Sequence, residues 1–340
     1  MLELKFLEDK KGDVIQNSEV DAPTVISEEI GLESLNVLKG FSNCIVVRTQ
    51  EDLDGIPEDA RKHVKAVINR KLHLPDRLIE SMPQLKLVAR TGVGFDRSRV
   101  NAELLRKMGV WLTTNPGNNS RAVSEFVICL IISLLRKISD ADQSVKTGNW
   151  NTNLFVGSEI AEKTIGIIGF GNIGKRVCRY ALSLEMKVIA YDPLISTVDA
   201  EKYGAHFMEI DDLIMKSDII TLHLPLSEQT RNILNGDRME KMKKNAIIIN
   251  TSRGGLIDES ALYNLLVSGA IAGCALDVLE REPPDRNNKL IQLNNVIVTP
   301  HIAGSTIEAY RKGAMMAVDE VRRVLSGEKP LNPVFQIEVP

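Results

Sequence analysis

The chain has 340 residues, of which 44% are hydrophobic and 26% charged, and its formal net charge is −3. This length allows two domains, each with its own core. The nearly balanced charge gives no reason to expect nucleic acid or a membrane as a partner, and the longest largely apolar run, Phe126–Leu135, is too short to span a bilayer. Because neither cysteines nor histidines show metal-ligand or disulfide spacing and no signal-peptide core is visible, we expect a cytoplasmic protein without a metal.

The first part of the chain alternates short apolar runs with helical patterns. Residues 1–60 are the least informative, and only Asn43–Val47 reads as a strand there. A long helix is predicted over Arg121–Thr147, and its first half is apolar nearly all round, which indicates burial. The remaining predictions are strands at Lys65–Asn69, Leu85–Ala89 and Val110–Thr113 and helices at Leu74–Met82 and Asn101–Met108.

From Thr164 onward strands and helices alternate regularly, which predicts a parallel sheet covered on both faces. A last helix is expected over Ser305–Leu325. Ligands on such sheets bind beyond the carboxyl ends of the strands. The predicted strands are Ile165–Ile168, Val188–Tyr191, Ile219–His223, Ala246–Asn250, Gly273–Val278 and Val296–Thr299, and the helices between them include Ile173–Leu184, Ile210–Lys216 and Glu259–Ser268.

A glycine turn in this part has the pattern of a dinucleotide site. Gly169, Gly171 and Gly174 form G-x-G-x-x-G between a buried strand and a helix, whose N-terminus would face a pyrophosphate. Asp192 ends the next strand, 18 residues after Gly174, where a carboxylate binds a ribose hydroxyl. This carboxylate would repel a 2′-phosphate, so the sequence favours NAD over NADP.

Three polar residues follow later strands and could carry chemistry. Oxidation of an alcohol by a nicotinamide cofactor needs a base, an anion that orients it and a fixed cation for the substrate, and His301, Glu282 and Arg253 fit these roles. Taken singly, each is more often a turn residue, a loop charge or a surface ion pair. The turn Arg90–Asp96 could likewise bind an anion, although the residues alone favour an ordinary strand-to-helix turn.

Seven motifs in this order resemble the D-isomer-specific 2-hydroxyacid dehydrogenases, in particular 3-phosphoglycerate dehydrogenases and hydroxypyruvate or glyoxylate reductases. The resemblance runs from about Lys65 to Pro333 and is weak over residues 1–60. The motifs are ARTGVGFD, the helix closing in GNW, GFGNIG with YDP, HLPLSEQT, NTSRGGLIDE, ALDVLEREPP and TPHIAGST.

The resemblance implies an α/β fold, with a Rossmann NAD-binding domain (115–303) inserted into a smaller flavodoxin-like substrate-binding domain (1–114 and 304–340). It makes Arg253 the substrate-binding arginine, His301 the acid/base and Glu282 its orienting partner. Val93 and Gly94 would receive the substrate carboxylate. The resemblance thus favours an anion-binding turn at Arg90–Asp96, where the residues alone favour an ordinary strand-to-helix turn. Further cofactor contacts are implied for Val93, Asn172, Ile173, Thr251, Ser252, Asp277 and, through its main chain, Leu224.

The resemblance leaves the substrate open. D-3-phosphoglycerate, with its 2-keto acid phosphohydroxypyruvate, is the first expectation and places the protein in serine biosynthesis; hydroxypyruvate or glyoxylate is the second. Relatives often carry arginine at the position of Asn69, so Arg70 or Lys71 could meet a substrate phosphate, unless they form a solvated face. We also expect a homodimer, and no C-terminal regulatory domain with feedback inhibition by serine. An alternative of another class is a co-repressor-like dimer that senses NADH.

Overall fold

The computed structural model describes residues 14–15, 23–28, 30–94, 99–194 and 200–337. The chain divides into two compact units, and each is described by itself. Unit 1 comprises Met1–Asn119 with Thr306–Pro340, and unit 2 comprises Ser120–Ser305. The expected domain boundaries at 114/115 and 303/304 stay predictions.

Unit 1 contains a mixed sheet whose strand order is β1-β3-β2-β4-β5-β6. All neighbouring strands are parallel except β1, which pairs antiparallel with β3 at the edge. Without that edge strand, the order is the 2-1-3-4-5 order of flavodoxin-like folds. The strands are β1 (Val14–Ile15), β2 (Thr24–Glu28), β3 (Asn43–Val47), β4 (Val64–Asn69), β5 (Leu87–Arg90) and β6 (Trp111–Thr113).

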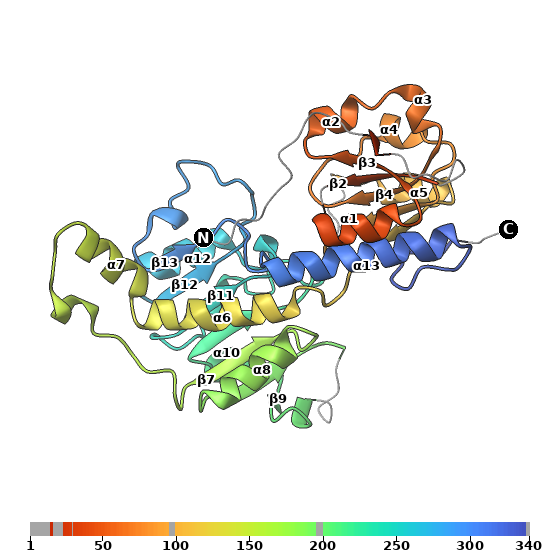
Figure 1. The fold of residues 1–340 in the computed structure, drawn as a ribbon. Coiled ribbons are helices and arrows are strands. Elements are labelled where there is room, and N and C mark those ends of the chain that lie inside the picture. The colour runs from red at the N-terminus through yellow and green to blue at the C-terminus, as the bar shows by residue number, and fades with distance from the viewer. Residues whose placement is uncertain (1–13, 16–22, 29, 95–98, 195–199, 338–340) are drawn as a thin grey trace. The chain divides into compact units, whose positions relative to one another are not determined.

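Helices cover both faces of this sheet (Figure 1). On one face, α1 (Leu32–Lys39) and α13 (Ile307–Leu325) pack against each other and bury Leu38 and Val321 over the strands. The other face is covered by α2 (Gln50–Asp54), α3 (Glu58–Arg61), α4 (Asp76–Glu80) and α5 (Ala102–Lys107). Burial on both faces explains why most positions of these strands are apolar, instead of alternating with polar ones.

Unit 2 is built on a parallel sheet of order β13-β12-β11-β10-β7-β8-β9. This is the doubly wound Rossmann order with one further strand, and its direction of winding reverses between β7 and β10. The strands are β7 (Thr164–Ile168), β8 (Lys187–Tyr191), β9 (His206–Phe207), β10 (Ile219–Leu222), β11 (Ile247–Asn250), β12 (Gly273–Leu276) and β13 (Val296–Val298).

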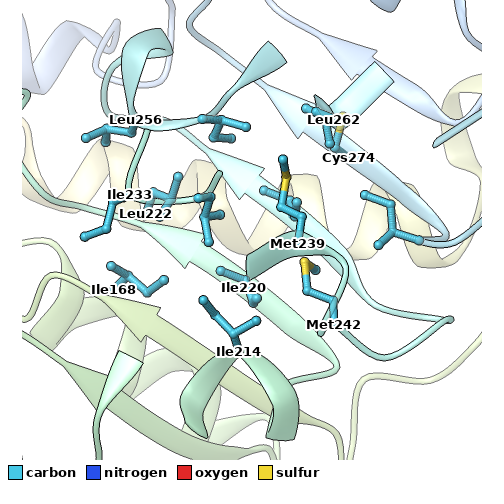
Figure 2. Packing of buried hydrophobic residues seen from close by; sticks show 14 of the residues in the cluster. Ile168, Ile214, Ile220, Leu222, Ile233, Met239, Met242, Leu256, Leu262 and Cys274 are labelled. Carbon is cyan, nitrogen blue, oxygen red and sulfur yellow. The ribbon is translucent and has the colours of Figure 1, made fainter. Parts of the chain in front are cut away.

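Two hydrophobic clusters flank the sheet of unit 2. One face packs against α6 (Ser120–Leu135) and α8 (Gly174–Ser183). The other face packs against α10 (Ile210–Lys216), α11 (Gly236–Met239) and α12 (Glu259–Val267). Figure 2 shows this second cluster, in which Ile220 and Leu222 of β10 lie with Ile214 of α10 and Met239 of α11. The predicted α/β class with two helix-covered sheets is therefore confirmed.

The long helix predicted over Arg121–Thr147 is wrong in one respect, because the structure has two helices there. Helix α6 ends at Leu135, and α7 (Ile138–Lys146) follows after Lys137, whose φ of +52° is left-handed. Burial explains the difference between the two helices, because α6 buries seven residues and α7 buries none. The structure also has β1, β2, α1 and α2 within residues 1–60, where only one strand was predicted.

Candidate active site

At the glycine turn, neighbouring backbone atoms lie too close to two of the three glycines to leave room for a side chain. Gly169 has a φ of +100°, and a Cβ there would lie 2.7 Å from the carbonyl carbon of His223. A Cβ on Gly174 would lie 2.2 Å from the carbonyl oxygen of Gly169, so the start of α8 is packed tightly against β7. A Cβ on Gly171 would meet nothing within 4 Å, which leaves open space beside the turn. The turn therefore fits a pyrophosphate next to its backbone.

Asp192 ties the end of β8 to this turn. Its carboxylate accepts hydrogen bonds from the backbone N–H of Phe170 (2.7 Å) and of Leu194 (2.8 Å). These two bonds use one lone pair on each oxygen and leave the others for a ribose hydroxyl. Its expected role at the ribose stays a prediction. Asn172 and Ile173 lie in the same turn, immediately before α8.

The carboxyl ends of β10 and β11 lie near the place between β7 and β10 where the direction of winding of the sheet reverses. Burial lowers the pKa of His223 from its ordinary value of 6.5 to about 3, so its ring is neutral; Nε2 lies 3.0 Å from Thr221 Oγ1. Ser252 donates a 2.5 Å hydrogen bond to the carbonyl of Leu224, which joins the two loops. Among described residues, His223 Nδ1 and Thr251 Oγ1 are buried without a partner, and such atoms suit a bound cofactor.

The loop that carries Arg253 is shaped by the last residue of β11. The Asn250 amide donates to the carbonyl of Arg253 (2.8 Å) and accepts from the N–H of Ser252 (3.0 Å). A Cβ on the next residue, Gly254, would lie 2.0 Å from the carbonyl carbon of Leu279. The Arg253 loop is thus packed directly on the loop that follows β12 and leads to Glu282.

His301 and Glu282 are in direct contact. Imidazole Nδ1 lies 2.8 Å from a carboxylate oxygen of Glu282, and the His301 side chain is 51% exposed. The other carboxylate oxygen of Glu282 accepts the N–H of Leu279 (3.2 Å). The paired carboxylate orients the ring and leaves Nε2 available to exchange a proton. Of the three predicted chemical groups, two therefore touch, while Arg253 lies on the adjoining loop and donates to the carbonyl of Ser252.

Asp277 has a role that the sequence did not predict. This 1% exposed carboxylate accepts hydrogen bonds from Thr299 Oγ1 (2.6 Å) and from the N–H groups of Ile302 and Ala303 (both 2.8 Å). It holds the loop in which His301 adopts a left-handed φ of +55°. The expected contact with the nicotinamide carboxamide stays a prediction. Glu259, missed likewise, accepts the N–H of Glu280 (2.6 Å), and burial raises its pKa.

Arg70, Val93 and Gly94 belong to unit 1. The turn with Val93 and Gly94 follows β5, and Val93 is exposed. Arg70 follows β4, and its guanidinium lies over the ring of Tyr310. Because Asn69 pairs with Arg90 in neighbouring strands, both loops lie at the same edge of the sheet. Phe95 and Asp96 of the same motif lie outside the described residues.

Comparison with known proteins identifies the family. Residues 128–303 match the D-isomer specific 2-hydroxyacid dehydrogenase, NAD binding domain. D-3-phosphoglycerate dehydrogenase of Archaeoglobus fulgidus is 35% identical over 310 residues, 91% of this chain and 58% of that protein. Hydroxypyruvate reductase of Thermotoga maritima is 40% identical over 250 residues, 73% of this chain and 80% of that protein.

Solved structures support the same assignment. The D-lactate dehydrogenase of Aquifex aeolicus, complexed with NAD and lactic acid, has a TM-score of 0.78 at 28% identity and covers 92% of this chain and 100% of that one. This chain belongs to the D-isomer-specific 2-hydroxyacid dehydrogenase family, and the predicted resemblance and NAD-binding domain are confirmed. The chain spans only about half the length of several D-3-phosphoglycerate dehydrogenases that it matches.

The described residues contain no cluster of three or more histidine, cysteine or acidic residues arranged to hold a metal ion. None of their helices is both long and apolar enough to cross a bilayer.

Proposed function

We propose that the protein is an NAD-dependent dehydrogenase that interconverts a D-2-hydroxy acid and its 2-keto acid. The observation that carries this proposal is the 2.8 Å contact between His301 and Glu282 at the carboxyl edge of the sheet in the NAD-binding unit. An imidazole oriented by a carboxylate is a general acid and base that works near neutral pH. The adjoining Arg253 loop supplies the cation that a carboxylate substrate requires.

Each residue has a defined part in the reduction of the keto acid. Arg253 binds the substrate carboxylate and polarises the keto oxygen, while the Val93–Gly94 turn receives the carboxylate through its backbone. His301 donates the proton to the keto oxygen, and Glu282 orients its ring. The glycine turn, Asp192, Thr251 and Asp277 would hold NADH, which would supply the hydride for C2.

For the substrate, we propose D-3-phosphoglycerate and phosphohydroxypyruvate, and hence a role in serine biosynthesis. Similarity to D-3-phosphoglycerate dehydrogenases along 91% of the chain supports this choice, as does the cation of Arg70 beside the carboxylate turn. Hydroxypyruvate or glyoxylate is the second candidate, because a hydroxypyruvate reductase is 40% identical and a glyoxylate reductase 36% identical.

The test is NADH oxidation with phosphohydroxypyruvate, hydroxypyruvate, glyoxylate and pyruvate. We expect turnover, fastest with phosphohydroxypyruvate, and a loss of about 10²- to 10⁴-fold in His301→Gln, because the general acid is removed. NADH affinity, measured by fluorescence, should change little in this variant. An active His301→Gln enzyme would contradict the mechanism. NADH binding without turnover of any of these acids would instead favour a dinucleotide-sensing protein.

We also propose a homodimer formed through unit 2. Five large apolar side chains between α6 and β7 are exposed, and Trp150 is 82% exposed. Apolar exposure on this scale along one segment is typical of an interface, and a second copy of the chain is the expected partner. The four cysteines are free, and three are buried, which fits the proposed cytoplasmic location.

A further inference from the structure

The loop after β4 is folded around a buried carboxylate. Glu28, the last residue of β2, accepts the backbone N–H groups of Arg70 (2.6 Å), Lys71 (2.8 and 2.9 Å) and Leu72 (3.2 Å). Glu28 is only 8% exposed. Consecutive N–H groups that converge on one point form an anion-binding concavity, and the protein fills this one with its own carboxylate. The amide of Asn69 closes the loop by donating to the carbonyl of Leu72 (2.9 Å).

This loop places the Arg70 guanidinium flat on an aromatic ring. Its central carbon lies 3.7 Å from the centre of the Tyr310 ring in α13. Stacking uses the face of a guanidinium and leaves the N–H donors at its edge free to bind an anion in their plane. Within the described part of the chain, no carboxylate forms an ion pair with this guanidinium.

The stacked cation lies next to the turn proposed to receive the substrate carboxylate. Thr91 is the residue that leads into that turn, and its N–H donates to the carbonyl of Asn69 (3.1 Å). The loop of Arg70 and the turn of Val93 therefore follow adjacent strands, β4 and β5. Adjacent strands lie about 4.8 Å apart, which is of the order of the distance between the two ends of a three-carbon 2-keto acid.

We propose that Glu28 is a positioning residue that orders the loop of Arg70 and so holds its guanidinium on Tyr310, ready for a phosphomonoester at the far end of the substrate. This inference rests on the proposed function and makes it more specific. The Glu28 carboxylate would itself repel a phosphate. Its proposed role is therefore indirect: it fixes the loop that carries the phosphate-binding cation. Among the described residues, the Glu28 carboxylate accepts hydrogen bonds from the backbone of this loop, and the Tyr310 ring lies against the face of the guanidinium.

The test compares phosphohydroxypyruvate with hydroxypyruvate, which differ only in the phosphate, in Glu28→Gln and Tyr310→Leu. Glutamine keeps the side-chain volume but turns an NH₂ group toward backbone N–H donors, which loosens the loop. We expect the KM for phosphohydroxypyruvate to rise about tenfold in both variants. The KM for hydroxypyruvate and both kcat values should stay near those of the wild type.

Glu33→Gln is the matched control. Glu33 lies in α1 and forms an exposed 3.2 Å ion pair with Arg311 of α13, so its loss should leave both KM values unchanged. If Glu28→Gln does not fold, Tyr310→Leu decides the question, because that side chain is partly exposed.

Each other result has a distinct meaning. Equal increases in both KM values, or no increase in either, would overturn the positioning role. A wild type without preference for phosphohydroxypyruvate would overturn the phosphate subsite while leaving the dehydrogenase reaction in place. No turnover of any 2-keto acid would overturn the proposed function itself, and this inference with it.

Discussion

At the scale of single residues, buried carboxylates of unit 2 hold loops in place through hydrogen bonds from backbone N–H groups. Asp192 joins the glycine turn to β8, and Asp277 holds the loop of His301. A carboxylate that accepts backbone N–H groups fixes the backbone more firmly than an apolar contact does, because those donors would otherwise be buried unpaired. The groups proposed to bind NAD therefore also shape the site before any ligand arrives.

His223 leads to a prediction about acid stability. Its pKa is lowered by burial to about 3 in the folded chain, against an ordinary 6.5 when exposed. Between these values the unfolded chain binds a proton that the folded chain does not, so this group makes stability fall as the pH drops from 6.5 towards 3. His223→Asn cannot take up this proton.

Thermal melts of both proteins from pH 7.5 to pH 4 measure the effect. We expect the variant to be less stable at pH 7.5 and the difference to shrink as the pH falls, because only the wild type loses this contribution. The titration of other groups is common to both proteins and cancels. Parallel melting curves across this range would show that His223 is not held neutral by burial.

At the scale of elements, the site depends on how closely two loops pack. A Cβ on Gly254 would lie 2.2 Å from the N–H nitrogen of Glu280, so Gly254→Ala must push the Arg253 loop away from the Glu282 loop. Displacements of about 1 Å cost on the order of 10²-fold in rate, and we expect such a loss in kcat/KM. NADH affinity should change less than this, since the glycine turn and Asp192, two of the proposed NADH contacts, follow other strands.

Gly236→Ala is the control for this prediction. Its Cβ would lie 3.4 Å from the Cβ of Ala261, an ordinary contact, so activity and melting temperature should stay close to the wild type. Full activity of Gly254→Ala would mean that the two loops need not touch for the reaction to occur.

At the scale of the whole molecule, the exposed apolar segment after α6 predicts the oligomeric state. We expect the wild type to sediment as a dimer and Trp150→Ala to dissociate at least about tenfold more readily, since large aromatic side chains dominate interfaces. Leu331→Ala, a 61% exposed residue of unit 1, should leave the dimer intact. A monomeric wild type would contradict the proposed dimer.

The sequence by itself determined the local elements and the order of the chemical groups. The G-x-G-x-x-G turn and the polar residues at the ends of aliphatic strands are local patterns, so β7, α8, β11, β12 and β13 were predictable. The same patterns identified the family. The helix over residues 121–147 was less predictable, because its break at Lys137 follows from where the core ends rather than from a helix-breaking residue.

Only the tertiary structure decided which residues meet. The contact of Glu282 with His301, the packing of Gly254 on Leu279 and the bonds from Glu28 to residues 70–72 join positions 19 to 44 residues apart. In a parallel sheet such neighbours are set by strand order and register, which depend on the burial of whole faces. The sequence gives no local indication of a buried glutamate that holds a loop through backbone N–H groups, because its partners are main-chain atoms that nearly every residue has.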